Sequence, residues 1–560
     1  MKTALQMNSV GKESWRNYRR FLWLMAAMLL IACLRVIDDP DIWFHLSFGR
    51  EIVTNGIPDQ EFLVFTRFGE PADYNSWGFG VLYFEAWSML GLYGMAWINA
   101  AIGTATLLLL VLAAQRHQQP PRLLPLCLVV TVAYIGMEFR LVYRPETLLY
   151  LAIAAEILLL ERYLDGANYR WLLPIPVLTA LIAMSHPSAI IIIGIAGLYS
   201  LQALWDRRLN WPDFRRSLVS LSTLIIAALA LSGLTPIGYE QLLLPIYFAL
   251  NSPVTQDIVE FLPAMETEYG THFLVLAIAI PAAIFYSRPR RVIDLLLYLV
   301  FAYLAFKHAR NIPLLVLVGF VPLARAAQQL WLATPARSTG LDTLGIVFCG
   351  VILMLVPLRQ QLWGIGIKSS CCTEASATFL RQHRPQGNLL NFYDLGNYLG
   401  WALKGEYPVF IDGRNNVASQ GLRMHDFLFR ADPGWRRLAA RHNIRTIVTR
   451  ATLPYSGTLI PLVEELSGDP QWTLVVAELA GLTFIRNNEL PQPPLASLPK
   501  PQMIWNQVLA ETEITIAQNP DAAEIYHSRA KAFLHLGQSQ AANKSFQRYK
   551  DLGGVNNGFR

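Results

Sequence analysis

The sequence is organised around a short acidic stretch, Ile37-Asp38-Asp39-Pro40-Asp41-Ile42-Trp43-Phe44-His45-Leu46. It follows directly on an apolar run from Phe21 to Ile37, so three carboxylates and an imidazole stand where a membrane-spanning helix is expected to end. Ionisable groups at a membrane boundary are costly and usually mark a site. The alternative interpretation is a solvated helix end that Pro40 terminates and that Trp43 and Phe44 anchor at the interface.

The composition of the 560-residue chain is that of a polytopic membrane protein. Hydrophobic residues make up 53% of it and charged residues only 15%, whereas soluble domains carry about 25% charged residues. The net charge of +6 does not indicate nucleic acid as a partner, because the basic residues cluster in short loops between apolar runs. The basic N-terminal segment leads into a long apolar run without a small-residue cleavage site, so we expect the first span to stay in the membrane.

A membrane-spanning helix needs about 20 apolar residues, and about eleven runs in the chain approach this length. We predict spans at 21–37, 95–114, 122–137, 145–160, 171–184, 187–205, 217–233, 271–287, 291–306, 311–331 and 341–363. A further helix, at 81–90, is expected to lie in the membrane interface.

Alternate loops are basic and are predicted to be cytoplasmic by the positive-inside rule. They hold Arg116, His117 and Arg122, then Arg162 and Arg170, then Arg207, Arg208, Arg215 and Arg216, then Arg288, Arg290 and Arg291, and finally Arg325 and Arg337. The other loops carry most of the unusual polar residues: 38–41, 138–146, 185–187, 234–270 and 307–310. This sorting predicts one outward-facing site built from several loops, with the N-terminus cytoplasmic and the C-terminus periplasmic in a bacterial inner membrane.

Beyond the spans, the pattern changes to that of a soluble α/β domain. Short apolar runs predict strands at 388–392, 408–411 and 445–449 and a closing hairpin at 472–476 and 482–485. We predict four parts: a transmembrane domain (1–364), a periplasmic α/β domain (365–490), a proline-rich linker (491–501) and a helical module (502–560). The last part has the residue spacing of one tetratricopeptide helix pair and is a candidate docking site for a protein partner.

The acids of the opening stretch are the first candidates for chemistry. Asp38, Asp39 and Asp41 can supply a general base or hard oxygen ligands for a divalent cation such as Mg²⁺ or Mn²⁺. His45 lies four residues after Asp41 and would share its face in a helix. An interfacial histidine bonded to a backbone carbonyl is the equally plain alternative for His45.

Arginines and histidines at the outer helix ends are the second set of candidates. Guanidinium groups bind phosphate by bidentate contacts, so Arg140, Arg144 and Arg310, together with His308, are candidates for holding a phosphate. Mutual pairing with nearby acids such as Glu138 and Glu146 is the alternative. His186 precedes a proline at a tight outward turn, where a structural role and a metal-ligand role are both open. The candidate metal ligands are Asp39, Asp41, Glu146 and His186.

The stretch from Asp38 to His45 resembles the acidic motif in the first outward loop of the GT-C glycosyltransferases. The segment Phe392-Tyr393-Asp394-Leu395-Gly396 is similar to the Trp-Trp-Asp-Tyr-Gly motif of oligosaccharyltransferase catalytic subunits, with Phe392 and Tyr393 in place of the two tryptophans. It is likewise followed by an apolar run and Asp412-Gly413-Arg414-Asn415-Asn416. Glu146 matches the second acidic motif of that family.

This resemblance implies a GT-C fold and transfer of a sugar from a polyprenyl-linked donor in the membrane to a periplasmic protein or glycan. It implies that an acid of the first motif is base or metal ligand, with Asp39 and Asp41 favoured over Asp38. It assigns the acceptor to Tyr393 and Asp394, and to Glu260 of the long outer loop. Transfer of a single sugar and of an oligosaccharide remain open. A transporter or flippase of lipid-linked sugars, and a non-catalytic envelope scaffold, are the alternatives from other classes.

Overall fold

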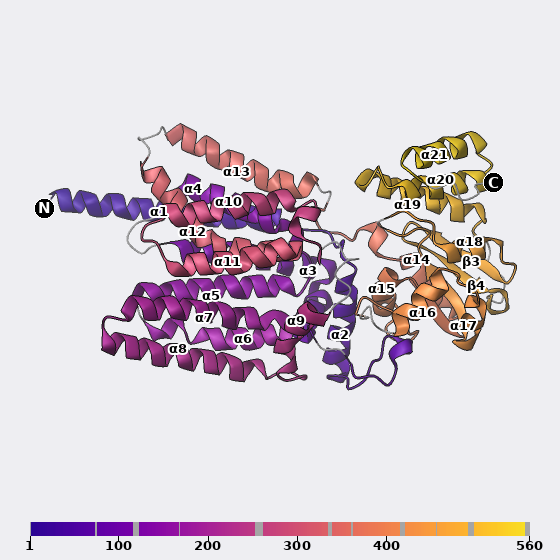
Figure 1. Ribbon diagram of the computed structural model, residues 1–560, viewed down its shortest axis with the longest axis horizontal. Coiled ribbons are helices and arrows are strands. Elements are labelled where there is room, and N and C mark those ends of the chain that lie inside the picture. The colour runs from indigo at the N-terminus through magenta and orange to yellow at the C-terminus, as the bar shows by residue number, and fades with distance from the viewer. Residues whose placement is uncertain are drawn as a thin grey trace. The chain divides into compact units, whose positions relative to one another are not determined.

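The computed structural model describes residues 2–72, 75–115, 122–166, 168–251, 261–333, 339–359, 362–414, 420–454, 456–490 and 498–554. The chain divides into two compact units (Figure 1). Unit 1 comprises Met1–Ile37 and Tyr74–Gly366, and unit 2 comprises Asp38–Asp73 and Ile367–Arg560. Each unit is therefore assembled from two separate stretches of sequence. The predicted four-part division stays a prediction, and residues 491–497 of the predicted linker lie outside the described residues.

Unit 1 is helical, and each of the apolar runs predicted to span the membrane contains a helix. Its α-helices are α1 (Lys2–Ala32), α3 (Trp77–Ala114), α4 (Leu123–Met137), α5 (Glu146–Gly166), α6 (Pro174–Ser185), α7 (Ile190–Arg207), α8 (Trp211–Ser232), α9 (Glu240–Asn251), α10 (Gly270–Tyr286), α11 (Val292–Lys307), α12 (Ile312–Ala333) and α13 (Thr339–Arg359). Short 3₁₀ turns connect several of them, among them η2 (Glu138–Arg140), η4 (Pro187–Ala189) and η8 (Ala309–Asn311).

The protein is a multi-span membrane protein. Six helices of the described residues are long and apolar enough to cross a membrane: Trp77–Ala114, Leu123–Arg140, Pro187–Arg207, Trp211–Ser232, Ala309–Leu332 and Asp342–Arg359. Two shorter apolar helices, Tyr169–Ser185 and Gly270–Tyr286, accompany them. The total of about eleven spans and their orientation stay predictions.

The predicted interfacial helix at 81–90 forms the first part of α3. The helix is interrupted at Gly91, whose φ of +57° and ψ of −141° are not helical. Because a left-handed φ is unfavourable for residues with a Cβ, glycine at this position allows the sharp change of direction. Met89 and Leu90 beside the kink are exposed, as expected for side chains that face lipid.

A buried cluster of charges ties four helices of unit 1 together. Glu161 of α5 accepts hydrogen bonds from the guanidinium groups of Arg291 and Arg325 and, at 2.9 Å, from the hydroxyl of Tyr199. Asp294 on α11 lies 2.9 Å from Arg291 and pairs with the same arginine. Two of the arginines counted in the predicted cytoplasmic loops are therefore neutralised inside the helical unit.

Unit 2 is built on a four-stranded sheet of order β1-β2-β4-β3. Its strands are β1 (Asn388–Asn391), β2 (Ile444–Thr449), β3 (Trp472–Glu478) and β4 (Gly481–Arg486), with β1 parallel to β2 and the other pairs antiparallel. Its α-helices are α2 (Asp41–Asn55), α14 (Glu374–His383), α15 (Gly396–Ala402), α16 (Gln420–Phe429), α17 (Trp435–Arg441), α18 (Pro461–Gly468), α19 (Gln502–Gln518), α20 (Ala523–His535) and α21 (Ser539–Asp551). The predicted strands at 388–392 and 445–449 and the predicted hairpin are confirmed.

The predicted strand at 408–411 is wrong. Val409 makes only an isolated bridge, to Val64 of the segment 38–73. The N–H of Val409 donates to the carbonyl of Leu63 at 2.9 Å. The side chain of Asn391 takes the next backbone groups, accepting from the N–H of Phe410 at 2.8 Å and donating to the carbonyl of Ile411 at 2.8 Å. Val409, Phe410 and Ile411 are buried and apolar as in a strand, but the hydrogen bonds of the segment go to a loop and to a side chain.

Trp43 does not anchor the chain at a membrane interface, as the alternative interpretation of the opening stretch required. Its side chain is 1% exposed and packs on α15, edge-to-face with Tyr398 at 5.1 Å and stacked with Trp401 at 6.4 Å between ring centroids. Arg50, further along α2, lies over the Trp401 ring and donates to its carbonyl at 3.0 Å. These contacts pack α2 against α15 within unit 2.

A buried charge network makes a second connection between the two segments of unit 2, residues 38–73 and residues 367–560. Arg414 donates to both carboxylate oxygens of Glu61, at 2.9 and 3.1 Å, and to Asp412 at 2.5 Å. Burial by itself would raise the pKa of Glu61, but the charge and hydrogen bonds of Arg414, with the N–H groups of Leu63 and Val64, hold it below its ordinary value. Burial raises the pKa of Asp412 against the opposing charge of Arg414.

The C-terminal helices pack on the sheet domain through a buried carboxylate. Glu511 of α19 accepts from the N–H of Ala451 at 3.1 Å, and from the N–H and hydroxyl of Thr452 at 2.7 and 2.8 Å. Trp505 of α19 stacks on His535 of α20 with ring centroids 3.7 Å apart. The predicted helix pair is observed as α20 and α21, and α19 precedes it. All three helices form part of the same compact unit as the sheet.

Replacing Glu511 with alanine is expected to loosen the C-terminal helices. Two buried backbone N–H groups would lose their acceptor, which costs about 2 kcal/mol or more. Thermal melting and limited proteolysis between the sheet and α19 measure the loss. Glu513, two residues away on the same helix and 70% exposed in its pair with Arg529, provides the control; Glu513→Ala should change stability by less than about 0.5 kcal/mol. Equal melting of Glu511→Ala and wild type would refute the role given to Glu511.

Glu61→Gln is expected to destabilise unit 2 at pH 7 by about 2 kcal/mol, the worth of a hydrogen bond to a charged group. Because the pKa of Glu61 is lower in the folded state, its contribution is present above its ordinary pKa of about 4.3 and is lost as pH falls through the lower folded value. The difference in melting temperature between variant and wild type should therefore shrink in acid. Glu70→Gln, which removes an exposed carboxylate that pairs with Arg67, is the control. A gap that stays constant down to pH 3 would contradict the prediction.

Candidate active site

The three acids of the opening stretch have distinct surroundings in unit 2. Asp39 is 8% exposed, and its Oδ1 accepts the N–H of Asp41 at 3.0 Å, an arrangement that starts α2. The carbonyl of Asp38 accepts a hydrogen bond from the thiol of Cys371 at 2.9 Å. Burial, followed by the negative charge of Asp38, raises the pKa of Cys371 to about 12, so the thiol stays protonated as a donor.

Asn397 of α15 holds the carboxylate of Asp41. Its Nδ2 donates to Asp41 Oδ1 at 3.1 Å, and its Oδ1 accepts the N–H of Gly413 at 2.7 Å. A Cβ at Gly413 would come within 2.9 Å of Asp41 Oδ1 and 2.7 Å of the Asn397 amide, so the backbone can approach this closely only at a glycine. Asn397 is 2% exposed, which fixes its amide, and with it the position of the Asp41 carboxylate.

The segment that resembles the acceptor motif lies beside Asp41. The hydroxyl of Tyr393 donates to the carbonyl of Gly413 at 3.1 Å. Burial, and then the negative charges of Asp41, Asp412 and Asp394, raises the pKa of Tyr393, so its phenol stays protonated. Asp394 pairs with Arg450, with 2.6 Å between Asp394 Oδ2 and Arg450 Nε. The structure therefore brings Asp41 and Tyr393 together, whereas the Asp394 carboxylate is taken up by an arginine.

His45 lies on the same helix as Asp41, α2. It is 6% exposed, and its ring packs against that of Phe44 with centroids 4.0 Å apart. Glu260, assigned to the acceptor by resemblance, lies outside the described residues, as do Asn415 and Asn416.

Unit 1 contains the predicted phosphate-binding arginines, and two of them share one acid. The Nη2 atoms of Arg140 and Arg310 both lie 2.7 Å from Oε1 of Glu146, at the start of α5. Arg144 lies half-buried in the turn just before α5. Glu146 thus holds two arginines in fixed positions, which is the pairing considered from the sequence.

The two candidate histidines of unit 1, His186 and His308, each contact backbone atoms. His308 Nδ1 lies 2.6 Å from the carbonyl of Phe261, and Arg310 stacks over the ring of the same phenylalanine at 4.7 Å. Phe261 directly follows residues 252–260, which lie outside the described residues. Its contacts with His308 and Arg310 fix it beside η8. His186 Nδ1 accepts the N–H of Ser188 at 3.0 Å and caps η4, the structural role left open for this residue.

Sequence reasoning missed Arg35, which lies two residues before Ile37 inside the first apolar run. Its guanidinium donates to the carbonyl of Glu138 at 3.1 Å and lies 3.7 Å from the Glu138 carboxylate. The hydroxyl of Tyr143 donates to the carbonyl of Arg35. Arg35 therefore joins the end of the first apolar run to the turn that carries Arg140. A charge inside an otherwise apolar run was the available signal.

The predicted metal ligands belong to two units, Asp39 and Asp41 to unit 2 and Glu146 and His186 to unit 1. Across the described residues, no three His, Cys, Asp or Glu side chains are grouped so that they could hold a metal ion. Asp39 and Asp41 nonetheless fit Mg²⁺ or Mn²⁺ chemically. The Asp39 carboxylate accepts the backbone N–H of Asp41, so the two residues belong to one turn. Mg²⁺ commonly takes only one or two protein carboxylates and completes its shell with water and phosphate.

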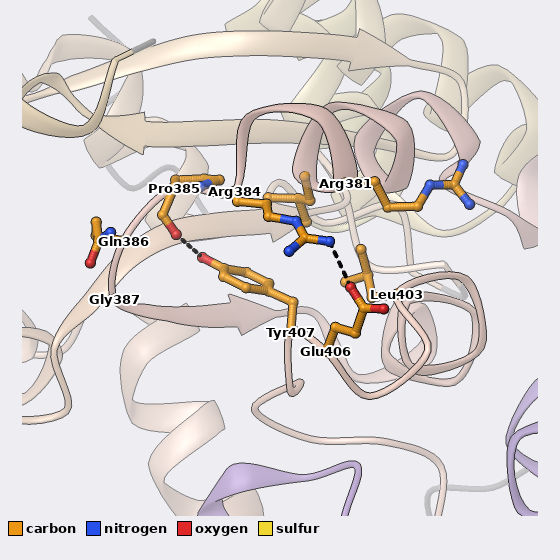
Figure 2. A pocket seen from close by; sticks show the side chains of 9 residues that line it. Arg381, Arg384, Pro385, Gln386, Gly387, Leu403, Glu406 and Tyr407 are labelled. Carbon is orange, nitrogen blue, oxygen red and sulfur yellow. Dashed lines mark hydrogen bonds and ion pairs between the residues drawn. The ribbon is translucent and has the colours of Figure 1, made fainter. Parts of the chain in front are cut away.

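A separate cleft of about 250 Å³ opens in unit 2 between the end of α14 and the turn before Tyr407 (Figure 2). Arg384 pairs with Glu406 at 2.8 Å, and the hydroxyl of Tyr407 donates to the carbonyl of Pro385 at 3.1 Å, as Figure 2 shows. Arg381 at its edge pairs with Glu374 at 3.0 Å. None of the predicted site residues lines this cleft, and its cations have carboxylate partners.

Comparison with solved structures identifies the fold. The archaeal oligosaccharyltransferase AglB from Archaeoglobus fulgidus, solved with an inhibitory peptide and a dolichol-phosphate, superposes with a TM-score of 0.55 over 86% of this chain and 75% of its own, at 12% identity. The mycobacterial arabinofuranosyltransferase AftD gives 0.55 over 83% of this chain and 41% of its own, at 17% identity. ArnT from Cupriavidus metallidurans gives 0.51 over 84% and 98%, at 11% identity.

No family model matches the sequence, and no curated protein does. At 11–17% identity the similarity to these enzymes is one of fold, and it extends over most of the chain. The resemblance of the acidic stretch and the three-dimensional similarity thus point to one class: the chain has the fold of the GT-C membrane glycosyltransferases.

Proposed function

We propose that this protein is a membrane glycosyltransferase that moves a sugar or oligosaccharide from a polyprenyl-(pyro)phosphate donor to a periplasmic protein or glycan. The observation that carries the proposal is the Asp41 carboxylate, held by the buried amide of Asn397 next to Tyr393. This arrangement occurs in a chain whose fold is that of glycosyltransferases, one of which was solved with dolichol-phosphate. The proposed location is a bacterial inner membrane, with the N-terminus cytoplasmic and the C-terminus periplasmic.

In the proposed reaction, the carboxylate of Asp41, or of Asp39, takes the proton of the acceptor nucleophile as the nucleophile attacks the anomeric carbon. The bond between that carbon and the donor phosphate breaks, and the polyprenyl-(pyro)phosphate leaves with the electron pair. The hydrogen bond from Asn397 orients Asp41 for this role, since a displaced base loses much of its effect. If Asp39 and Asp41 bind a divalent cation, that ion supplies neutralisation of the phosphate charge.

Arg140 and Arg310, with Arg144 and His308, are proposed to bind the donor phosphate. Glu146 brings the guanidinium groups of Arg140 and Arg310 together on one carboxylate oxygen, and guanidinium groups bind phosphate by strong charge-assisted hydrogen bonds. We propose that Glu146 positions these arginines, in place of the metal-ligand role considered from the sequence. Fixed cations of this kind stabilise a leaving phosphate without reorganisation during the reaction.

Tyr393 is proposed to contact the acceptor, because it is half-buried and its hydroxyl donates to the carbonyl of Gly413, whose N–H is held by the same Asn397 as Asp41. Asp394 is proposed to act indirectly, by holding Arg450 at 2.6 Å in the same region. The acceptor role of Glu260 remains a proposal from resemblance alone. Mass spectrometry of envelope glycans and glycoproteins from a strain that lacks the protein would identify the acceptor. An unchanged glycan and glycoprotein profile would count against the proposal.

Asp39→Asn and Asp41→Asn are each expected to lower the rate of sugar transfer by about 100-fold or more, the usual worth of a general base. The assay is transfer from a polyprenyl-linked sugar by the purified protein in detergent. Asp59→Asn, in the same stretch of unit 2 and exposed, is the control and should leave the rate unchanged. Full activity of both Asp39→Asn and Asp41→Asn would defeat the assignment.

Alanine in place of both Arg140 and Arg310 is expected to raise the KM for the donor by about tenfold or more, because two charge-assisted contacts to phosphate are lost. Arg140→Lys with Arg310→Lys should restore part of the affinity. Arg216→Ala removes an exposed arginine of unit 1 that pairs with Asp213, and serves as the control. A KM that stays at the wild-type value in the double alanine variant would exclude the two arginines from donor binding.

A further inference from the structure

Unit 2 contains a groove that none of the proposed site residues lines. It has a volume of about 510 Å³ and lies between α16 and α17, which are neighbours in Figure 1. Sites for small ligands commonly measure about 300–1,000 Å³. The lining is supplied by three arginines, Arg423, Arg437 and Arg441, and by Gln420, Met424, Phe427, Pro433, Gly434 and Leu438.

The faces of α16 and α17 that point away from the groove are buried in unit 2. On α16, His425 and Leu428 are buried, and the ring of His425 packs on Phe392 with centroids 5.6 Å apart. On α17, Trp435 is 3% exposed and anchors the start of the helix. The opposite faces point into the groove: Arg437 and Arg441 are four residues apart, so they lie on one face of α17.

Among the described residues, several arginines of unit 2 pair with acids, whereas two arginines of the groove do not. Carboxylate partners are recorded for Arg381, Arg384, Arg436, Arg445, Arg529 and Arg548. Arg437 and Arg441 have none within the part of the chain that the structure describes, and no acid lines the groove. The contrast is closest between adjacent residues, because Arg436 pairs with Glu465 at 3.0 Å and Asp469 at 3.1 Å.

The chemistry of the lining selects the ligand. Guanidinium groups match the planar oxygens of carboxylate and phosphate groups bidentately. The half-buried Met424, Phe427 and Leu438 offer an apolar floor for the carbon face of a ring. The smaller cleft of Figure 2 lacks this character, because its Arg384 is neutralised by Glu406. An acidic sugar combines an oxyanion with such a carbon face.

We infer that the groove between α16 and α17 binds an acidic saccharide, with uronate or phosphate groups, as part of the acceptor glycan. The inference rests on the proposed glycosyl transfer for the acceptor role, and it names the substrate class of that reaction. It makes the C-terminal unit a glycan-binding module that selects anionic acceptors. The binding itself needs neither donor nor transfer, so it can be measured alone.

Isothermal titration of the full chain in detergent with trigalacturonate tests the inference, with maltotriose as the neutral saccharide of equal length. Trigalacturonate should bind and maltotriose should not. Arg437→Ala with Arg441→Ala should weaken the binding about tenfold or more, through the loss of charge-assisted contacts. Arg436→Ala, the adjacent but acid-paired arginine, should bind within about twofold of wild type. Arg437→Lys with Arg441→Lys keeps the charge and should bind better than the alanine pair.

Further arms of the experiment separate other ligands. Pentaglutamate and vesicles of phosphatidylglycerol present carboxylates and phosphates without a sugar ring, and either binding more tightly than trigalacturonate through Arg437 and Arg441 overturns the inference. Absence of trigalacturonate binding, or equal binding by the alanine pair with an unchanged melting temperature, also overturns it. Because no donor is present, none of these outcomes bears on whether Asp39 and Asp41 support transfer, and the two proposals fail separately.

Discussion

The hydrogen bonds of Asn397 are the constraint on which the candidate site depends. One buried amide donates to Asp41 at the start of α2 and accepts from Gly413 beyond the sheet domain's buried segment 408–411. A buried amide has to satisfy its hydrogen-bonding groups, and here it does so by joining two stretches about 370 positions apart in the chain. The same closeness admits only glycine at 413. An acid that would be solvated at a free helix end is therefore held in a fixed orientation.

In both units, a buried charged side chain pairs with two side chains of opposite charge. Arg414 serves Glu61 and Asp412 in unit 2, while Glu146 and Glu161 each serve two arginines in unit 1. An isolated buried charge would be very unfavourable, and multiple partners offset its loss of water. The ratio differs from cluster to cluster: two acids on Arg414, but two arginines on Glu146. At Glu146 this sharing brings two guanidinium groups together on one carboxylate oxygen.

Much of the secondary structure was predictable because periodicity and apolar run length report directly on it. Helices occupy each predicted span, and the strands at 388–391 and 444–449 and the hairpin at 472–486 lie where the alternating pattern indicated them. The run at 408–411 shows the limit. Val409 to Ile411 are buried as in a strand, but their backbone groups bond to Leu63 and to the side chain of Asn391 and not to a neighbouring strand. No local pattern reveals a partner such as Leu63, which lies more than 300 positions away.

The sequence by itself determined that this is a multi-span membrane protein with an α/β segment behind the apolar runs, since hydropathy and charge are properties of the residues alone. Only the tertiary structure decided which segments fold together. It grouped residues 38–73 with residues 367–560, buried Trp43 in unit 2 and brought Asn397 and Gly413 to Asp41, although neither Asn397 nor Gly413 carries a strong sequence signal of its own. The physical reason is that a sequence pattern states which face of an element is buried, whereas the surface that covers that face is chosen by packing between residues far apart in the chain.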